Sequence, residues 1–316
     1  MSRRSALVAL GFVVLFLAGA FATLGWPPLP AGSGEILLLL RLPRVAMAAF
    51  VGGALALAGV VLQALFQNAL ASPLTLGVAG GAAFGGTLAV ALGWSASWLG
   101  LPGYFGLASL GALLALGLSY RIAWVRGQVN LMALLLSGVV LNFLFAALVM
   151  LLQYLADYTR AYETVRWLMG SLAVVGPQAP TGAGILTVVG GLVLYRWAPV
   201  LDLLSQGGEV AHGLGVAVGR YTTALFFVVS LLVGSTLALT GPIGFVGLVV
   251  PHFVRMQVGP GHRRLVPLAL LGGAAVLTAA DALARLAFYP AELPVGVVTG
   301  LLGTPYFLWI LWRQAR

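Results

Sequence analysis

The chain has 316 residues, of which 61% are hydrophobic and only 7% are charged. Soluble domains carry roughly a quarter charged residues, so this composition excludes a soluble globular protein. The net charge of +9 comes from arginines that flank apolar runs, where basic residues orient membrane helices, so it does not indicate a nucleic-acid partner. Cysteine is absent, which excludes disulfide bonds and cysteine-based catalytic or metal sites.

Uncharged apolar runs recur along the whole chain, and a membrane-spanning helix needs about 20 mostly apolar residues. By this length the sequence predicts about ten transmembrane helices, at approximately 6–25, 45–66, 74–93, 103–120, 131–155, 180–198, 221–239, 244–258, 265–285 and 294–312. The first run follows Arg3 and Arg4 as in a signal peptide, but it is long enough to span and lacks a convincing cleavage site. Residues 1–316 are therefore expected to form one all-α, polytopic membrane domain.

Arginines are distributed unequally between the two ends of these helices. With the N-terminus inside, the cytoplasmic ends receive Arg3, Arg4, Arg121, Arg126, Arg196, Arg220, Arg255, Arg263, Arg264, Arg313 and Arg316. The external ends receive Arg41, Arg44, Arg160, Arg166 and Arg285. Because cytoplasmic flanks are enriched in basic residues, both termini are predicted to be cytoplasmic.

Three segments fit neither a span nor a short loop. Residues 156–180 predict a short amphipathic helix on the external surface. Residues 199–220 form the longest polar stretch on the cytoplasmic side, where we expect a soluble partner to dock. Residues 240–244 break a long apolar run with glycine and proline, which predicts a tight external turn.

Glycines at every fourth position predict close helix packing. Gly77, Gly81 and Gly85 have this spacing, and so do Gly296 and Gly300. Small residues at such positions let two helix backbones approach each other closely in lipid. A mobile gate helix is the alternative interpretation of the same glycines.

The chain lacks the residues that several kinds of chemistry require. A Walker A loop ends in Gly-Lys-Ser or Gly-Lys-Thr, and this chain contains no lysine. ATP hydrolysis, if it is used, must therefore reside in a partner, and the chain is not expected to be an enzyme. His212, His252 and His262 fall in separate segments without a second ligand at metal-binding spacing, so no metal site is expected. An intramembrane hydrolase that uses Ser137 and His252 is an alternative without a recognisable motif.

Ionisable residues are rare inside the predicted spans, although ion-coupled secondary transporters usually place them near the bilayer midplane. Asp281 is the one carboxylate inside an apolar run, and Arg285 lies one helical turn further on. We expect a local Asp281–Arg285 ion pair near the outer end of this helix. An ion-coupled secondary transporter stays as an alternative function.

Several motifs occur in a fixed order along nearly the whole chain. They are Arg41-Leu42-Pro43-Arg44, residues 59–73 followed by Leu76-Gly77-Val78, Trp167 with Gly170-Ser171-Leu172, and residues 208–215, 241–252 and 292–300. Together they resemble the FecCD family of permeases, which import iron-siderophores, haem and cobalamin with an ATP-binding-cassette engine. The resemblance implies a type II ABC importer permease fold with ten helices per subunit. It also implies a homodimer that works with two ATPase subunits, which hold ATP and Mg, and with a periplasmic or lipid-anchored substrate-binding protein.

The resemblance also implies roles for individual residues. Arg41, Arg44 and Arg285 match arginines that dock the binding protein, and an arginine grips a carboxylate with two parallel hydrogen bonds. The ATPase-coupling residues are Gly207, Gly208, Glu209, Ala211, His212, Leu214 and Gly215. The gate residues are Asn68 and Leu70 at one gate, and Asn130, Leu131 and Met132 at the second. At the first gate Ala69 stands where the family usually has proline, and the second gate lacks the family's hydroxyl side chains.

The expected function is therefore the permease subunit of an ABC importer that moves an iron chelate, a siderophore or haem, across the inner membrane. Cobalamin is the runner-up substrate, because the family's cobalamin permease is similar in residues 41–70 and 292–309. A separate binding protein does much of the substrate selection, so few residues of the path need to be specific.

Overall fold

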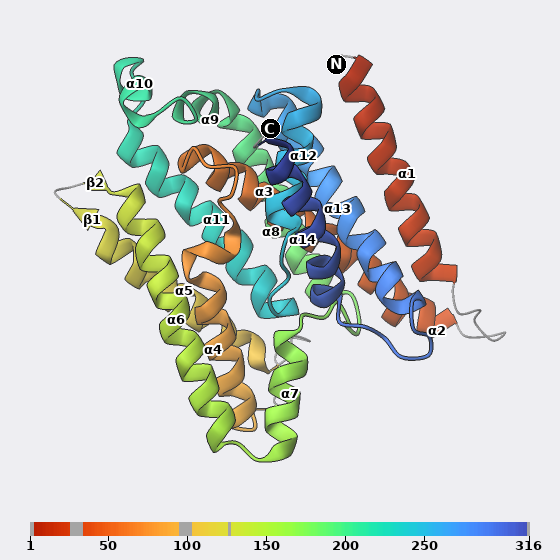
Figure 1. The fold of residues 1–316 in the computed structure, drawn as a ribbon. Coiled ribbons are helices and arrows are strands. Elements are labelled where there is room, and N and C mark those ends of the chain that lie inside the picture. The colour runs from red at the N-terminus through yellow and green to blue at the C-terminus, as the bar shows by residue number, and fades with distance from the viewer. Residues whose placement is uncertain (1–2, 26–33, 95–102, 126–127, 315–316) are drawn as a thin grey trace.

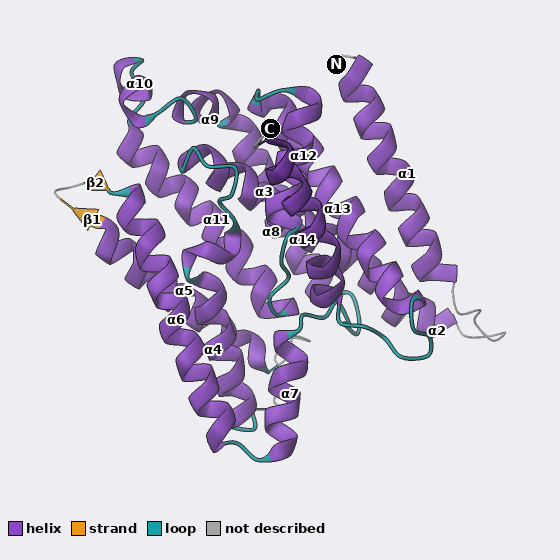
Figure 2. Cartoon of the chain, in the orientation of Figure 1, coloured by secondary structure: helices purple, strands orange, loops and turns teal. Residues whose placement is uncertain are grey.

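The computed structural model describes residues 3–25, 34–94, 103–125 and 128–314. Two arginines that enter the orientation prediction, Arg126 and Arg316, lie outside these residues. Within them the chain is all-α apart from one antiparallel hairpin, formed by β1 (Trp124–Val125) and β2 (Gln128–Val129). Figures 1 and 2 show the helices as one bundle.

Each of the ten predicted spans corresponds, in order, to a helix in the described part of the chain. These helices are α1 (Arg3–Gly25), α3 (Leu42–Leu65), α4 (Val78–Ala91), α5 (Tyr104–Ala123), α6 (Leu131–Leu155), α8 (Gln178–Arg196), α11 (Val218–Thr240), α12 (Val246–Val258), α13 (His262–Leu286) and α14 (Val295–Gln314). Seven of the described helices are long and apolar enough to cross a membrane, whereas the apolar parts of α4, α12 and α14 are shorter. The predicted all-α membrane fold with about ten helices is confirmed.

Shorter elements connect these helices. They are α2 (Gly34–Ile36), the π-helical turn η1 (Leu37–Arg41), the 3-10 turn η2 (Pro73–Leu76), α7 (Tyr158–Leu168), α9 (Ala198–Leu204) and α10 (Gly208–Gly213). The amphipathic helix expected within residues 156–180 is α7. It begins after Asp157, whose carboxylate accepts a hydrogen bond of 2.9 Å from the backbone N–H of Arg160 and so caps the helix.

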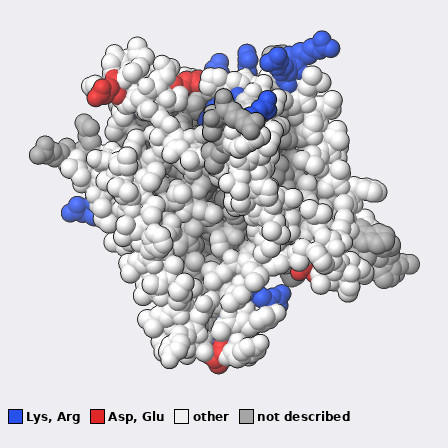
Figure 3. All heavy atoms as spheres, in the orientation of Figure 1, with Lys and Arg blue, Asp and Glu red and all other residues white. Residues whose placement is uncertain are grey.

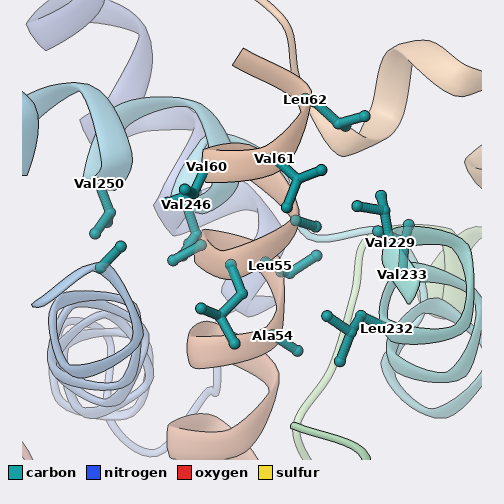
Figure 4. Packing of buried hydrophobic residues seen from close by; sticks show 14 of the residues in the cluster. Ala54, Leu55, Val60, Val61, Leu62, Val229, Leu232, Val233, Val246 and Val250 are labelled. Carbon is teal, nitrogen blue, oxygen red and sulfur yellow. The ribbon is translucent and has the colours of Figure 1, made fainter. Parts of the chain in front are cut away.

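The centre of the bundle is α3, which is apolar on all its faces. In its most apolar stretch 83% of the residues are buried, against 22% in the peripheral helix α1. A helix without a polar face has to bury its whole circumference or face lipid. Figure 4 shows Leu55 and Val61 of α3 between α11, which contributes Val229, and α12, which contributes Val246.

Glycines bring several helix backbones into direct contact. A Cβ on Gly81 of α4 would collide with the carbonyl of Gly111 on α5, and the predicted packing role of Gly81 and Gly85 is confirmed. A Cβ on Gly52 of α3 would likewise collide with the carbonyl of Gly273 on α13. Such contact is possible because glycine has no side chain to separate the two helices.

The other predicted glycines differ from one another. Gly77, with φ +78°, precedes α4, and a Cβ there would lie 3.1 Å from the carbonyl oxygen of Gly138 on α6, so the predicted close contact is present at this position. Gly296 packs against the backbone of Met169, as expected, whereas nothing lies within 4 Å of a Cβ on Gly300 in the described chain. The close-packing prediction is thus wrong for Gly300 within this subunit.

Both termini lie at the same end of the bundle. Figure 1 shows that α1 begins and α14 ends at the end that carries α9 and α10, while α2 and α7 lie at the opposite end. We call these the α10 end and the α7 end. Most of the arginine side chains visible in Figure 3 lie along the α10 end.

Candidate docking, gating and coupling sites

A cluster of charges joins α3, α13 and the loop before α14. Arg44 donates to both oxygens of Asp281, with distances of 2.9 to 3.1 Å, and its Nη1 donates to Glu292 at 2.8 Å. The Asp281 side chain is 1% exposed and that of Arg44 13%. The expected Asp281–Arg285 pair is wrong, because the carboxylate lies against α3, where Arg44 reaches it from a distant part of the chain.

The other two predicted docking arginines belong to the same cluster. Arg41 is buried and donates to the carbonyl of Leu24 at the end of α1. Arg285 donates to the carbonyl of Thr23 at 3.0 Å, and its Nε lies 3.3 Å from Glu292. The structure thus brings all three arginines together, and their docking of a partner stays a prediction.

Glu292 is the most exposed carboxylate of this cluster, with 48% of its side chain accessible. Burial by itself raises its pKa, but the hydrogen bond and charge of Arg44, helped by Arg285, outweigh burial and lower the pKa below its usual value. Glu292 is therefore ionised at neutral pH and binds both arginines from the solvent side.

Pro43 explains the local backbone at these arginines. Proline has no N–H, so the carbonyl of Leu39 loses its partner within the helix. Gly176, from the segment before α8, donates its N–H to that carbonyl at 2.8 Å. The preceding turn is π-helical, with the N–H of Leu42 bonded to the carbonyl of Leu37. The motif Arg41-Leu42-Pro43-Arg44 is thereby fixed to its surroundings through the backbone.

The predicted coupling segment, residues 199–220, forms two short helices at the α10 end, α9 and α10 (Figure 1). Ala211 is buried and anchors α10, whereas Glu209, His212 and Leu214 are exposed. Leu214 exposes 62% of its surface and Val210, in α10, exposes 46%. The segment thus presents an apolar and polar surface on a fixed base.

Asp202 and His262 fix the base of this segment. The backbone N–H of His262, the first residue of α13, donates to the Asp202 carboxylate at 2.8 Å, and its ring Nδ1 lies 2.7 Å from the same oxygen. The contact joins α9 to the beginning of α13. The sequence predicted His262 at a helix end or in a loop and Asp202 in the polar cytoplasmic segment, and the 60 residues between them gave no sign that they pair.

Glycines set the turns on both sides of α10. Gly207 has φ +119° and Gly215 has φ +86°, conformations that L side chains rarely adopt. Gly208 begins α10 itself. The coupling segment therefore contains a pair of sharp turns at Gly207 and Gly215.

The first predicted gate lies in the segment between α3 and α4, residues 66–77, which includes the 3-10 turn η2 and which we call the gate turn. Asn68 accepts a hydrogen bond of 2.8 Å from the N–H of Leu70, and both residues are exposed. Gln67 has φ +48°, an uncommon conformation for a residue with a side chain. A Cβ on Gly207 would lie 3.6 Å from Nε2 of Gln67, so the gate turn reaches the joint between α9 and α10.

The second predicted gate lies where the β1–β2 hairpin enters α6. Asn130 caps α6 through a 3.0 Å hydrogen bond from the N–H of Ala133. Leu131 is partly buried and Met132 is exposed. The gate role of Asn130 is predicted from the family resemblance alone, and the contact observed for its side chain is that of a helix cap.

Asn142 is a functional candidate that the sequence analysis missed. From α6 its Nδ2 donates to the carbonyl of Leu74 at 2.8 Å and its Oδ1 accepts from Gly80 at 3.0 Å. Gly138, one turn earlier, lets α6 approach Leu76 closely. These contacts join α6 to the gate turn and to the first turn of α4, and they give the carbonyl of Leu74 a partner inside the protein. The signal available in the sequence was the amide side chain of Asn142 inside an otherwise apolar run.

Gln63, in the last turn of α3 before the gate turn, connects α3 to α12. Its Nε2 donates to the carbonyl of Leu248 at 3.0 Å, and its Oε1 accepts from Arg255 at 3.0 Å. Gln63 is buried, so the two bonds satisfy a side chain that would otherwise be costly in an apolar bundle.

Two of the sequence motifs meet at the tight turn between α11 and α12. The N–H of Ser171 donates to the carbonyl of Thr240 at 2.7 Å, and a Cβ on Gly241 would collide with the carbonyl of Trp167. Gly170 and Gly241 both have positive φ. The turn predicted at residues 240–244 is confirmed, and its glycines serve backbone contact with the segment after α7.

The proposed hydrolase pair is not formed. Ser137 donates to the carbonyl of Leu134 at 3.0 Å and lies 3.4 Å from that of Ser119. The Nε2 atom of His252 is buried without a hydrogen-bond partner in the described chain. A serine held by backbone carbonyls has no base to activate it.

Comparisons with known proteins agree with this arrangement. The model of the FecCD transport family matches residues 6–313. The chain belongs to this family. A solved structure described as a metal-chelate type ABC transporter in an inward-facing conformation is 34% identical, with a TM-score of 0.87 over 98% of this chain and 99% of that one. The FecCD chain thus has the type II ABC importer permease fold.

Two curated relatives of this FecCD chain carry different cargoes. The hemin transport system permease HmuU of Yersinia pestis is 41% identical over 89% of this chain and 84% of its own length. The cobalamin import permease BtuC of Halobacterium salinarum is 39% identical over 89% of this chain and 74% of its own length.

Proposed function

We propose that this FecCD permease carries an iron chelate, haem or a siderophore, inward across the inner membrane, powered by ATP hydrolysis in a partner. The observation that carries the proposal is the 41% identity to a hemin permease across nearly the whole length of both chains. Cobalamin is the second candidate, because a cobalamin permease is 39% identical over the same share of this chain.

The chain itself is not an enzyme in this proposal. Two such chains form a homodimer whose shared axis is the path, and two ATPase subunits bind ATP and Mg. A periplasmic or lipid-anchored protein delivers the chelate. The absence of lysine, and with it of a Walker A loop, supports a separate ATPase.

The binding protein docks at the α7 end and the ATPase at the α10 end, so the N- and C-termini face the cytoplasm. Arg41, Arg44 and Arg285 receive the carboxylates of the binding protein. Glu292 occupies two of these arginines in the isolated chain, and an incoming carboxylate has to displace or join it. Exposed Leu214 and Glu209 fit a groove with apolar and polar walls on the ATPase.

Proteoliposomes test this function. The permease is reconstituted with its ATPase and binding protein, and uptake of haem, a ferric siderophore and cobalamin is measured with and without ATP. We expect ATP-dependent uptake of an iron chelate that survives collapse of ion gradients. Uptake that requires no ATP and stops when the gradient collapses would refute the proposal, and ATP-driven uptake of cobalamin alone would select the second candidate.

Two variants separate docking from coupling. Replacing Arg41, Arg44 and Arg285 together with glutamate should abolish capture of the binding protein in a pull-down. Replacing Glu209 and Leu214 should leave that capture intact but uncouple ATP hydrolysis from uptake. Undiminished capture in the first variant, or normal coupled uptake in the second, would contradict the assigned roles.

A further inference from the structure

A groove of about 510 Å³ lies between α1, the end of α8 and the first turns of α13. This volume falls within the roughly 300–1,000 Å³ typical of small-molecule sites. Its charged wall consists of Arg263 and Arg264. Tyr195 of α8 lies at its side.

The groove changes from basic to apolar along its length. Beyond the two arginines, α13 contributes Leu268 and Leu271, one and two helical turns further on, and α1 contributes Ala9. A ligand that matches both parts has an anionic group joined to a hydrocarbon chain. Inorganic phosphate or a soluble nucleotide would leave the apolar part unused.

Both arginines are available for such a ligand. Arg263 and Arg264 are exposed, and the ion pairs found among the described residues include neither of them. More positive charge lies beside the groove in the chain, because Arg4 precedes Ser5 and Arg196 follows Tyr195, and both are exposed. An anion at the basic end of the groove therefore meets positive charge from three helices, α1, α8 and α13.

The groove is also at the depth where a lipid headgroup lies. It opens beside α1, whose outer face exposes a series of apolar side chains from Leu7 to Phe21 that faces hydrocarbon. Ser5 and Ala9 mark the α10 end of this apolar face. Tyr195, half-exposed at the end of α8, is a residue type enriched at the membrane–water boundary.

We propose that this groove binds one anionic phospholipid of the leaflet at the α10 end. The phosphate lies between Arg263 and Arg264, and an acyl chain lies along Leu268, Leu271 and Ala9. Basic pockets between transmembrane helices are suited to anionic headgroups, and each arginine near an anionic surface contributes about fivefold in affinity, or ~1 kcal/mol. The site is independent of the transported cargo, so it does not rest on the proposed function.

Native mass spectrometry of the full-length permease in detergent tests the site. The probes are phosphatidylglycerol, phosphatidylcholine with the same chains, and glycerol phosphate. We expect phosphatidylglycerol to bind at least tenfold more tightly than the other two. The double variant Arg263→Gln/Arg264→Gln should lose at least tenfold of this affinity, and Ala9→Phe, which fills the apolar part, should lose it while all arginines remain.

The matched control is Arg121→Gln/Arg220→Gln, which removes the same charge from exposed positions outside the groove. This control should bind phosphatidylglycerol within twofold of the unaltered protein. Equal losses in the control and the Arg263/Arg264 variant would overturn the proposal, because the attraction would then be general surface charge. Unchanged binding in the Arg263/Arg264 variant, or tight binding of glycerol phosphate alone, would overturn it as well.

Discussion

Asp281 holds Arg44 in a site from which water is almost excluded. Breaking a buried ion pair by removing one partner typically costs about 3–5 kcal/mol, because the remaining charge stays buried without compensation. Arg44 keeps Glu292 as a second partner at 2.8 Å, so we expect Asp281→Asn to lower the unfolding free energy by about 3 kcal/mol, the lower end of this range, measured by denaturant titration in detergent micelles.

Asp157→Asn is the control for this prediction. Asp157 pairs with Arg160 at 3.4 Å, with side chains 61% and 46% exposed, and exposed pairs contribute about 0–1 kcal/mol. Asparagine also preserves the cap of α7. Equal losses in the two variants would show that Asp281 contributes no more than a surface pair.

The lowered pKa of Glu292 makes its ion pairs depend on pH. Its carboxylate stabilises the folded chain fully above its usual pKa of about 4.5, and this contribution is lost as the pH falls through the lowered folded-state value. Glu292→Gln should therefore lower the melting temperature at neutral pH, with a difference from the unaltered protein that shrinks to zero in acid. A difference that stays constant down to about pH 3 would argue against these ion pairs.

At the scale of single residues, local sequence was a poor guide to partners. Arg44 and Asp281 are 237 residues apart, whereas the four-residue spacing within one helix predicted that Asp281 pairs with Arg285. The same difficulty applies to Asp202 with His262 and to the role of Asn142. A side chain's partner across two helices depends on helix rotation and packing, which residue spacing within one helix does not contain.

At the scale of elements, Gly207 controls the joint between α9 and α10. Its φ of +119° and ψ of 146° are nearly restricted to glycine, and a side chain there costs roughly 1–3 kcal/mol of strain. Gly207→Ala should therefore displace α10 and reduce ATP-driven uptake several-fold in proteoliposomes that contain the ATPase.

The matched substitution is Gly213→Ala, in the same short helix. Nothing lies within 4 Å of a Cβ on Gly213, and its φ is not positive, so uptake should be unchanged. If both variants transport normally, the joint at Gly207 does not transmit motion. If both fail, the surface of α10 matters more than its hinge.

Element order was largely predictable. Ten apolar runs gave ten helices, because run length is set by bilayer thickness and needs no knowledge of packing. The short extents of α4 and α12 were less predictable, since the gate turn and the turn after Thr240 are themselves apolar. Their non-helical backbones are tolerated because Asn142 and Ser171 supply hydrogen bonds from other segments.

At the scale of the whole molecule, the chain's lack of cysteine permits a direct test of orientation. Tyr158→Cys on α7 and Val210→Cys on α10 place single thiols at exposed sites of opposite ends. With a membrane-impermeant maleimide, intact cells should label Tyr158→Cys, and Val210→Cys should require permeabilised cells. The reverse pattern would invert the proposed topology, and the unaltered protein gives the background.

The glycine contacts determine which parts of the bundle move together. Where Gly52 meets Gly273, and where Gly59 of α3 meets Gly247 of α12, two backbones touch and no layer of side chains lies between them. Helices can slide by small steps when intervening side chains change rotamer, and at these points none exist to change. We therefore expect α3, α12 and α13 to move as one unit, and opening of a path to occur at interfaces where side chains separate these helices from their neighbours.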